Sequence, residues 1–279
     1  MDKMHIEKDT VQETLVIPLY GRKLCTERFP SLFQDPKAVE LIDRLDYDYE
    51  AFATKASKLS QEFGALEVAM RQTDLAFEVR DYLSTHPNAA VVNLGCGLDQ
   101  TGENCDNGTC KIYNVDFPDI IEIRDQLVEK NDRTFTVAAD LNDLVWFDRI
   151  DASDGAVFFA AGVFYYFKKE DIQRLFTAMA KRFPGGRLAF DAAGTRAVKI
   201  MFKTMVKDAG ITSVTDYFSV DDLQRDVASW MIDGKVSSRG YMLGYNDLKD
   251  PSVPGLFRLL AKVADGFMKM CIVRIDFNG

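Results

Sequence analysis

The chain has 279 residues, of which 47% are hydrophobic and 28% are charged, a composition that can bury a large core and argues against disorder. Its 43 acidic and 34 basic residues give a formal net charge of −9, which disfavours a nucleic-acid partner because phosphate-backbone binding requires clustered Lys and Arg. The N-terminal run MDKMHIEKDTVQET is polar, and no later stretch offers about 18 uncharged apolar residues. We therefore expect a cytoplasmic protein without a membrane partner.

The first 85 residues have the apolar spacing of helices. Two segments each place four apolar side chains at helical intervals, namely Val39, Ile42, Leu45 and Tyr49 in the first, and Leu66, Met70, Phe77 and Leu83 in the second. We expect a helical N-terminal cap over residues 1–85, followed by one core unit over residues 86–279. The run TLVIPLYGRKLCTERFP combines apolar anchors with Arg22 and Lys23, which suits a lid over an acidic substrate or a cofactor carboxylate.

From Ala89 onward, short apolar strands alternate with amphipathic helices. The predicted strands are AAVVNL, KIYNVD, FTVAAD, AVFFAA and RLAFDA, and two of the helices are DIIEIRDQLVEK and DIQRLFTAMAKRF. The second of these helices carries Glu170 and Asp171 near its start, a buried stripe and a terminating PGG. This alternation predicts an α/β fold whose parallel sheet is covered by helices.

The first of these strands leads into the glycine-rich stretch VVNLGCGLDQTG. Gly95 and Gly97 occupy the strand-to-helix turn at which ligands bind in open parallel sheets, and they allow close approach of the backbone. A dinucleotide fingerprint would require glycine at position 100, where this chain has Gln100. The loop therefore disfavours NAD and favours a nucleoside ligand without a phosphate cradle, of which S-adenosylmethionine is the common example.

Two acidic residues follow the next two strands. Asp116 ends KIYNVD about twenty residues after the glycines, where a carboxylate can accept hydrogen bonds from two ribose hydroxyls. Asp140 ends FTVAAD, beside Leu141, and is placed to receive an adenine amino group. Each Asp has a helix cap or turn as its structural alternative, but their register after successive strands favours a ligand site.

The segments HPNAAVVNLGCGLD, YNVDFPDIIEIRDQL and FPGGRLAFDA together resemble the leucine carboxyl methyltransferase family, in particular its bacterial branch of O-methyltransferases of polyketide biosynthesis. The resemblance implies a Rossmann-like S-adenosylmethionine-dependent methyltransferase fold with a helical N-terminal cap and an antiparallel C-terminal strand, MKMCIVRIDF. It also implies that Arg71 holds the methionine carboxylate of the cofactor. The other cofactor-binding residues that we expect are Gly95, Cys96, Gly97, Asp116, Phe117, Asp140 and Leu141.

The chain departs from the family pattern at two places. Many members have an arginine soon after the glycine loop, whereas GLDQTGENC has none, and many have an acidic residue where AAGVFYYF has Ala161. The sequence names no catalytic residue, but Tyr20, Tyr165 and Tyr166 are candidates to line the acceptor site. Since no histidine is well placed as a base, a carboxylate acceptor, already ionised at neutral pH, is favoured over a hydroxyl of a small metabolite.

Two other functions stay open at this point. One is a cofactor-binding homologue without catalytic activity that has a regulatory or partner-binding role, and the other is an NAD-dependent oxidoreductase. The five cysteines are too scattered for a disulfide scaffold, and no C-x-x-C motif or nearby histidine completes a zinc set, so we expect no metal. The sequence leaves the choice between monomer and homodimer open.

Overall fold

The computed structural model describes residues 3–6, 13–49, 57–202, 218–232 and 234–279. Its centre is a seven-stranded sheet with the order β5-β4-β3-β6-β7-β9-β8. The strands are β3 (Ala90–Leu94), β4 (Lys111–Asp116), β5 (Thr134–Ala138), β6 (Ala156–Ala160), β7 (Arg187–Ala192), β8 (Gly234–Gly240) and β9 (Cys271–Phe277). Strands β3 to β7 pair in parallel, whereas β9 lies antiparallel between β7 and β8. The predicted mostly parallel sheet with an antiparallel C-terminal strand is confirmed.

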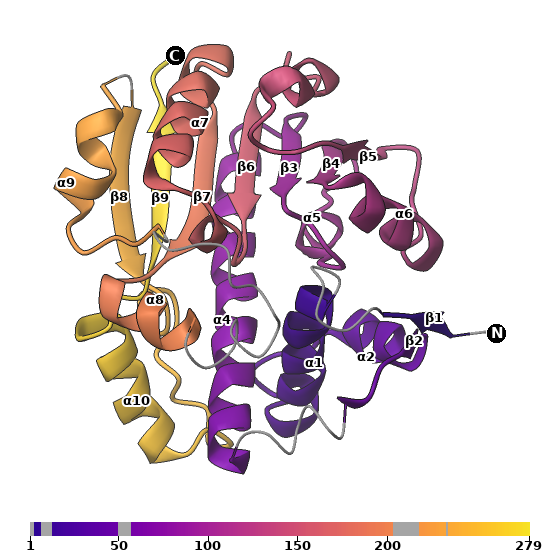
Figure 1. Cartoon of the computed structure of the whole chain (residues 1–279), viewed down its shortest axis with the longest axis vertical. Helices are drawn as coiled ribbons and strands as arrows, with labels where there is room; N and C mark the ends of the chain where they lie inside the picture. The colour runs from indigo at the N-terminus through magenta and orange to yellow at the C-terminus, as the bar shows by residue number, and fades with distance from the viewer. Residues whose placement is uncertain (1–2, 7–12, 50–56, 203–217, 233) are drawn as a thin grey trace.

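Helices cover both faces of this sheet (Figure 1). The long helix α4 (Lys58–Leu83) runs along one face and continues past the carboxyl ends of the parallel strands, and α7 (Lys169–Arg182) covers the other face. The remaining core helices are α5 (Thr101–Asn104), α6 (Pro118–Leu127), α8 (Thr195–Met201), α9 (Leu223–Asp226) and α10 (Gly255–Gly266), with 3₁₀ turns at Leu144–Arg149, Phe164–Tyr166 and Ala228–Trp230. Within the described ranges, no helix is both long and apolar enough to cross a bilayer.

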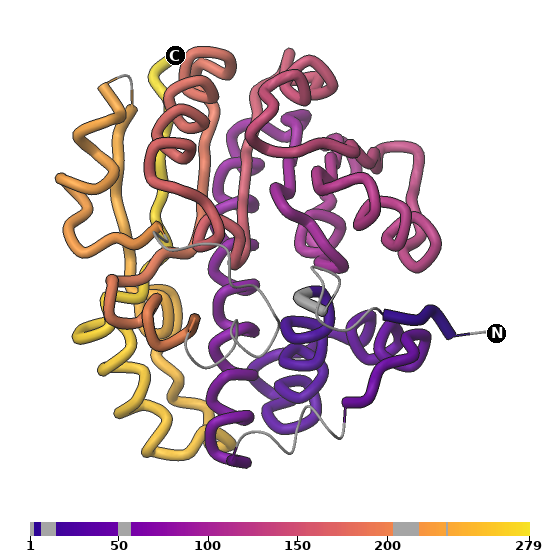
Figure 2. Tube along the Cα trace, viewed as in Figure 1, coloured from indigo at the N-terminus to yellow at the C-terminus, as the bar shows by residue number. Residues whose placement is uncertain are grey.

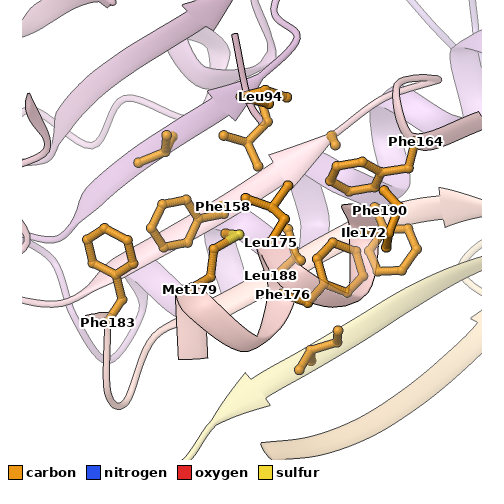
Figure 3. Packing of buried hydrophobic residues seen from close by; sticks show 14 of the residues in the cluster. Leu94, Phe158, Phe164, Ile172, Leu175, Phe176, Met179, Phe183, Leu188 and Phe190 are labelled. Carbon is orange, nitrogen blue, oxygen red and sulfur yellow. The ribbon is translucent and has the colours of Figure 1, made fainter. Parts of the chain in front are cut away.

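Adjacent residues of the central strands pack into different cores because successive side chains of a strand point to opposite faces. Phe158 of β6 packs in the core beneath α7, whereas Phe159 packs in the core beneath α4. Figure 3 shows the first core at close range, where Phe176 of α7 contacts Phe164 and Phe190 with ring centroids 5.1 Å apart in both pairs. The stripe predicted for the helix that opens with Glu170 and Asp171 is confirmed, with Ile172, Leu175, Phe176 and Met179 all buried.

The N-terminal segment forms helices α1 (Glu13–Arg28) and α2 (Pro36–Asp43), which lie beyond the carboxyl ends of β3 and β4 (Figures 1 and 2). Buried Val16 and Leu19 of α1 share a third core with Leu98 of the glycine loop and Ile120 of α6. The predicted cap is therefore joined to the rest of the molecule by common apolar packing.

Two details of the helical predictions were wrong. The helix predicted from residue 38 ends at Asp43, and Leu45–Asp46 instead forms the short strand β2, parallel to β1 (Met4–His5). The chain turns there because the N–H of Arg44 caps α2 and its guanidinium donates to two carbonyls at the end of α6. Residues 50–52 of that predicted helix lie outside the described part of the chain. The second wrong detail is the placement of Phe77 on the apolar face of its helix. Phe77 is 46% exposed and makes an edge-on ring contact with Tyr245 rather than packing in the core.

Replacing Phe176 with alanine is expected to lower the free energy of unfolding by about 3–5 kcal/mol, because it removes a fully buried ring between two others and leaves a cavity. Urea denaturation followed by circular dichroism measures this loss. The matched control is Ile232→Ala, whose side chain is 89% exposed and whose loss should change stability by less than about 0.5 kcal/mol. Equal effects of the two variants would contradict the assignment of this core.

Candidate cofactor site

The glycine loop connects β3 to α5 in a backbone conformation that favours glycine. Gly95 and Gly97 have φ angles of +63° and +47°, in the left-handed region that side chains with a Cβ rarely adopt. A Cβ on Gly95 would lie 2.6 Å from Val163 Cγ2, and one on Gly97 would lie 2.9 Å from Leu15 Cδ2. Both positions therefore require glycine. The backbone is left-handed there, and Val163, in the segment after β6, and Leu15 of α1 pack closely against the glycine loop.

Asp116 stands at the carboxyl end of β4 and is hydrogen-bonded to this loop. Its Oδ2 accepts from the backbone N–H of Gly97 at 2.8 Å, and its Oδ1 accepts from the N–H of Phe117 at 2.8 Å. Burial raises the pKa of Asp116, although these two N–H groups act in the opposite direction. Each carboxylate oxygen has a second lone pair that can accept a hydroxyl, so Asp116 can bind a ribose while it holds the loop.

Arg71 reaches the same edge of the sheet from the middle of α4. Its Nη1 donates to Oδ2 of Asp191, in β7, at 3.1 Å, and Oδ1 of Asp191 accepts from the N–H of Gly162 at 2.6 Å. Gly162 has a φ of +74°, and a Cβ there would lie 2.7 Å from Nη1 of Arg71. Burial disfavours the charged guanidinium, but Asp191, Tyr241 and Tyr165 together outweigh this penalty and raise the pKa of Arg71. Within the described part of the chain, the other guanidinium N–H groups of Arg71 have no hydrogen-bond partner in the protein, so they can receive an anionic ligand.

Further ionisable groups surround this arginine. Burial raises the pKa of the Tyr165 and Tyr241 hydroxyls well above the usual value, so both remain neutral hydrogen-bond donors. One helical turn before Arg71, burial raises the pKa of Glu67 to about 7, with Arg71 acting in the opposite direction. Asp74 is 1% exposed, and burial together with Asp265 and Glu78 raises its pKa to about 9.

The sequence-based reading missed four of these residues. Asp191 is the last residue but one of RLAFDA, so the argument from strand ends that found Asp116 could have found it as well. Gly162 follows β6 (Ala156–Ala160), but a single glycine after a strand gave no specific signal. Glu67 lies four residues before Arg71 on the same predicted helix, so the sequence could have paired them, whereas the approach of Tyr241 to Arg71 depends on the fold.

The other predicted cofactor residues lie at the same edge with different exposure. Asp140 is exposed beyond β5, the neighbour of β4, and its Oδ1 accepts from the N–H of Asn142 in a local turn. Leu141 is 5% exposed, whereas Phe117 is 41% exposed beside Asp116. Because Cys96 is 1% exposed, it contributes to the loop through its backbone and not through its thiol.

The three candidate acceptor tyrosines are not grouped together. Tyr165 is buried and interacts electrostatically with Arg71, and Tyr166 stacks edge-on against Phe202, with ring centroids 5.7 Å apart. Tyr20 instead stacks on Tyr49 at 5.7 Å, within the aromatic cluster of the cap.

The basic groups predicted for a lid over the site pair with protein carboxylates. Arg22 Nε donates to Asp35 Oδ2 at 2.9 Å, and Lys23 Nζ lies 2.7 Å from Glu27 Oε1. Arg22 is 5% exposed, which corrects the expectation that its charge faces a substrate directly.

A glycine loop, a carboxylate after the next strand and a buried arginine thus meet at the carboxyl edge of a mostly parallel sheet, the place where such sheets bind ligands. The fold is that of S-adenosylmethionine-dependent methyltransferases. It resembles the plantazolicin methyltransferase BpumL, solved with S-adenosylhomocysteine (TM-score 0.50, 11% identity, 96% of this chain and 100% of the other). It also resembles a DUF574 family protein from Streptomyces avermitilis (TM-score 0.64, 10% identity, 95% and 97% of the two chains).

Sequence comparison identifies the family. The chain is 29% identical over 183 residues to the tetracenomycin polyketide synthesis O-methyltransferase TcmP of Streptomyces glaucescens, a match that spans 65% of this chain and 66% of TcmP. Residues 16–180 match the leucine carboxyl methyltransferase model, and the chain belongs to that family. The resemblance noted in the sequence is confirmed, the cofactor of this class is S-adenosylmethionine, and the alternative of an NAD-dependent oxidoreductase is set aside.

The residues of the site fit this cofactor. The glycine loop allows a nucleoside to approach the backbone, the Asp116 carboxylate suits ribose hydroxyls, and the Arg71 fork suits a carboxylate. No phosphate cradle is required.

Gly162→Ala is expected to weaken the binding of S-adenosylhomocysteine by about ten-fold or more, because the new Cβ would displace the Arg71 guanidinium. Isothermal titration calorimetry measures the affinity. The control is Gly108→Ala, which imposes similar backbone strain at a φ of +89° but meets no atom within 4 Å. Both variants should lose about 1–2 kcal/mol of stability. Equal affinities of the two variants would contradict the proposed contact.

Proposed function

We propose that the protein is an S-adenosylmethionine-dependent O-methyltransferase that acts on a small molecule. The observation that carries this proposal is the placement of Asp116, hydrogen-bonded to the glycine loop, and of Arg71, paired with Asp191 of β7, at the carboxyl edge of the sheet in a chain of the leucine carboxyl methyltransferase family. The name of the relative TcmP, an O-methyltransferase of polyketide synthesis, supports an oxygen acceptor on a metabolite of that kind.

In this proposal each residue binds one part of the cofactor. Asp116 accepts the ribose hydroxyls, Arg71 donates to the methionine carboxylate, and Asp140 with Leu141 borders the adenine. When bound, the cofactor supplies a methyl group that its sulfonium has already activated. The chain must then align an acceptor oxygen with that methyl group and exclude water.

The charges around Arg71 favour a neutral hydroxyl as acceptor. Asp191 already balances Arg71, and the methionine carboxylate would use its remaining donors. Glu67 lies one turn away on α4, and Tyr165 and Tyr241 add no positive charge. A carboxylate acceptor would therefore add a further anion beside Asp191 and Glu67. These surroundings argue against the carboxylate that the sequence alone favoured and support a phenol or enol hydroxyl.

Glu67 is the group that we assign to accept the hydroxyl proton. It lies on α4 one turn before Arg71, and the N-terminal part of α4 extends past the carboxyl ends of the parallel strands (Figure 1). Its pKa near 7 leaves a large fraction ionised at neutral pH, and such a value suits a general base. A phenol, with an ordinary pKa of about 10, benefits from such a base.

Release of S-adenosylhomocysteine, measured over a panel of phenols and carboxylic acids, is expected to be greater with phenols. The rate should rise with pH through about 7, because Glu67 accepts a proton in its ionised form. Glu67→Gln should lower kcat by about a hundred-fold and remove this pH dependence while leaving affinity for the cofactor unchanged.

The control for this measurement is Glu122→Gln, a carboxylate exposed on α6, which should leave both kcat and the pH profile as in the wild type. Turnover on carboxylic acids alone would overturn the hydroxyl assignment. Binding of the cofactor without transfer to any acceptor would instead favour the non-catalytic alternative.

A further inference from the structure

Three successive carbonyl groups of the glycine loop accept hydrogen bonds from two buried arginines. Arg124 Nη1 donates to the carbonyl of Gly97 at 2.9 Å and to that of Asp99 at 2.6 Å. Arg22 Nη2 donates to the carbonyl of Leu98, between them, at 3.3 Å. Arg124 is 1% exposed and Arg22 is 5% exposed, so both guanidinium groups act inside the protein. The loop carbonyls are thereby directed toward the interior.

Arg124 belongs to α6 and is held by a carboxylate of α5. Its Nη2 lies 2.7 Å from Glu103 Oε1, which also accepts from Asn114 Nδ2 at 3.0 Å. A buried guanidinium fixed in this way presents its donors in a rigid fork, which a lysine cannot reproduce. Arg124 thus connects α6, α5 and β4 to the backbone of the loop.

Arg22 belongs to α1 and connects the loop to the cap. Its Nε donates to Asp35 Oδ2 at 2.9 Å, while Asp35 Oδ1 caps α2 by accepting from the N–H of Ala38 at 2.9 Å. The Nη1 atom lies 3.8 Å from Asp99 Oδ1. The same guanidinium, which belongs to the interior of α1, therefore touches the N-cap of α2 and the loop that follows β3.

The side chain of Asp99 reinforces this arrangement. It accepts hydrogen bonds from Gln72 Nε2 of α4 at 3.0 Å, from Asn93 Nδ2 of β3 at 3.2 Å, and from both the hydroxyl and the N–H of Thr101. These partners occupy Asp99 inside the protein. The glycine conformations of the loop are thus imposed by contacts from the cap, α4 and α6 together.

We propose that Arg124 and Arg22 are positioning residues for the cofactor loop, and that Arg22 couples the docking of the N-terminal cap to cofactor binding. This inference rests on the proposed function, since the ligand is the adenosyl cofactor. The chain lacks an arginine directly after Asp99, and the arginines that contact its loop come from α1 and α6. Because coupling between two sites is reciprocal, cofactor binding must also stabilise the cap.

The test compares the full-length wild type with Arg124→Lys, Arg22→Lys and Arg44→Lys by titration calorimetry with S-adenosylhomocysteine and by thermal denaturation. Arg44 is the matched control, because it is a cap arginine that also donates to two carbonyls, those of Gln126 and Leu127, away from the loop. Arg124→Lys and Arg22→Lys should each raise Kd by about ten-fold or more. Arg44→Lys should lower Tm but leave Kd within about two-fold of the wild type.

Hydrogen exchange gives a second readout that a purely structural role would not change. Saturation with S-adenosylhomocysteine should slow amide exchange in α1 of the wild type, and Arg22→Lys should reduce this protection at equal saturation. If Arg124→Lys does not fold, Arg22→Lys and the exchange measurement decide the question.

The possible failures are distinguishable. A folded wild type that does not bind S-adenosylhomocysteine would overturn the proposed function and this inference together. A wild type that binds, with unchanged affinity in folded Arg124→Lys and Arg22→Lys, would overturn the inference and leave the function intact. An equal loss of affinity in Arg44→Lys, or unchanged exchange in α1, would also contradict it.

Discussion

The ion pair between Arg71 and Asp191 is the contact on which the organisation of the site depends. A buried guanidinium without a partner would cost several kcal/mol, so α4 must keep Arg71 against the end of β7. The same Asp191 accepts from the N–H of Gly162, and this links the loop after β6 to the helix. Gly162 makes room for the guanidinium because it has no side chain. One carboxylate thereby brings α4, β6 and β7 together at the carboxyl edge, with donors of Arg71 left for a ligand.

The C-terminal end of α4 is fixed by a second set of charges. Arg187 of β7 lies 2.7 Å from Asp81 and 2.7 Å from Asp276, and the Tyr245 hydroxyl donates to Glu78 at 2.6 Å. The helix is therefore anchored by polar contacts at its middle, through Arg71, and near its C-terminal end, while its apolar residues fill the core. Such anchoring explains how a helix with buried Glu78 remains stable, and it helps to hold Arg71 against Asp191 at the end of β7.

The sequence predicted the elements whose signals are local. The strands around Phe158 and the stripe of α7 follow directly from side-chain periodicity, and Asp116 follows from its position after a strand. Leu45 was misplaced because a cap formed by Arg44 and strand pairing with β1 outweighed its helical spacing. Tyr241 was missed because long-range packing brings it to Arg71, whereas Glu67 was missed although the predicted helix places it one turn before Arg71. The roles of Arg22 and Arg124 likewise depend on which carbonyls the folded loop presents.

A crystal structure of the protein with S-adenosylhomocysteine is the most direct test of the central claim. We expect the ribose hydroxyls to lie about 3 Å from Asp116 and the methionine carboxylate about 3 Å from the Arg71 guanidinium, with the Asp191 pair retained. A ligand bound elsewhere, or one whose carboxylate is held by another group while Arg71 contacts Asp191 alone, would contradict it.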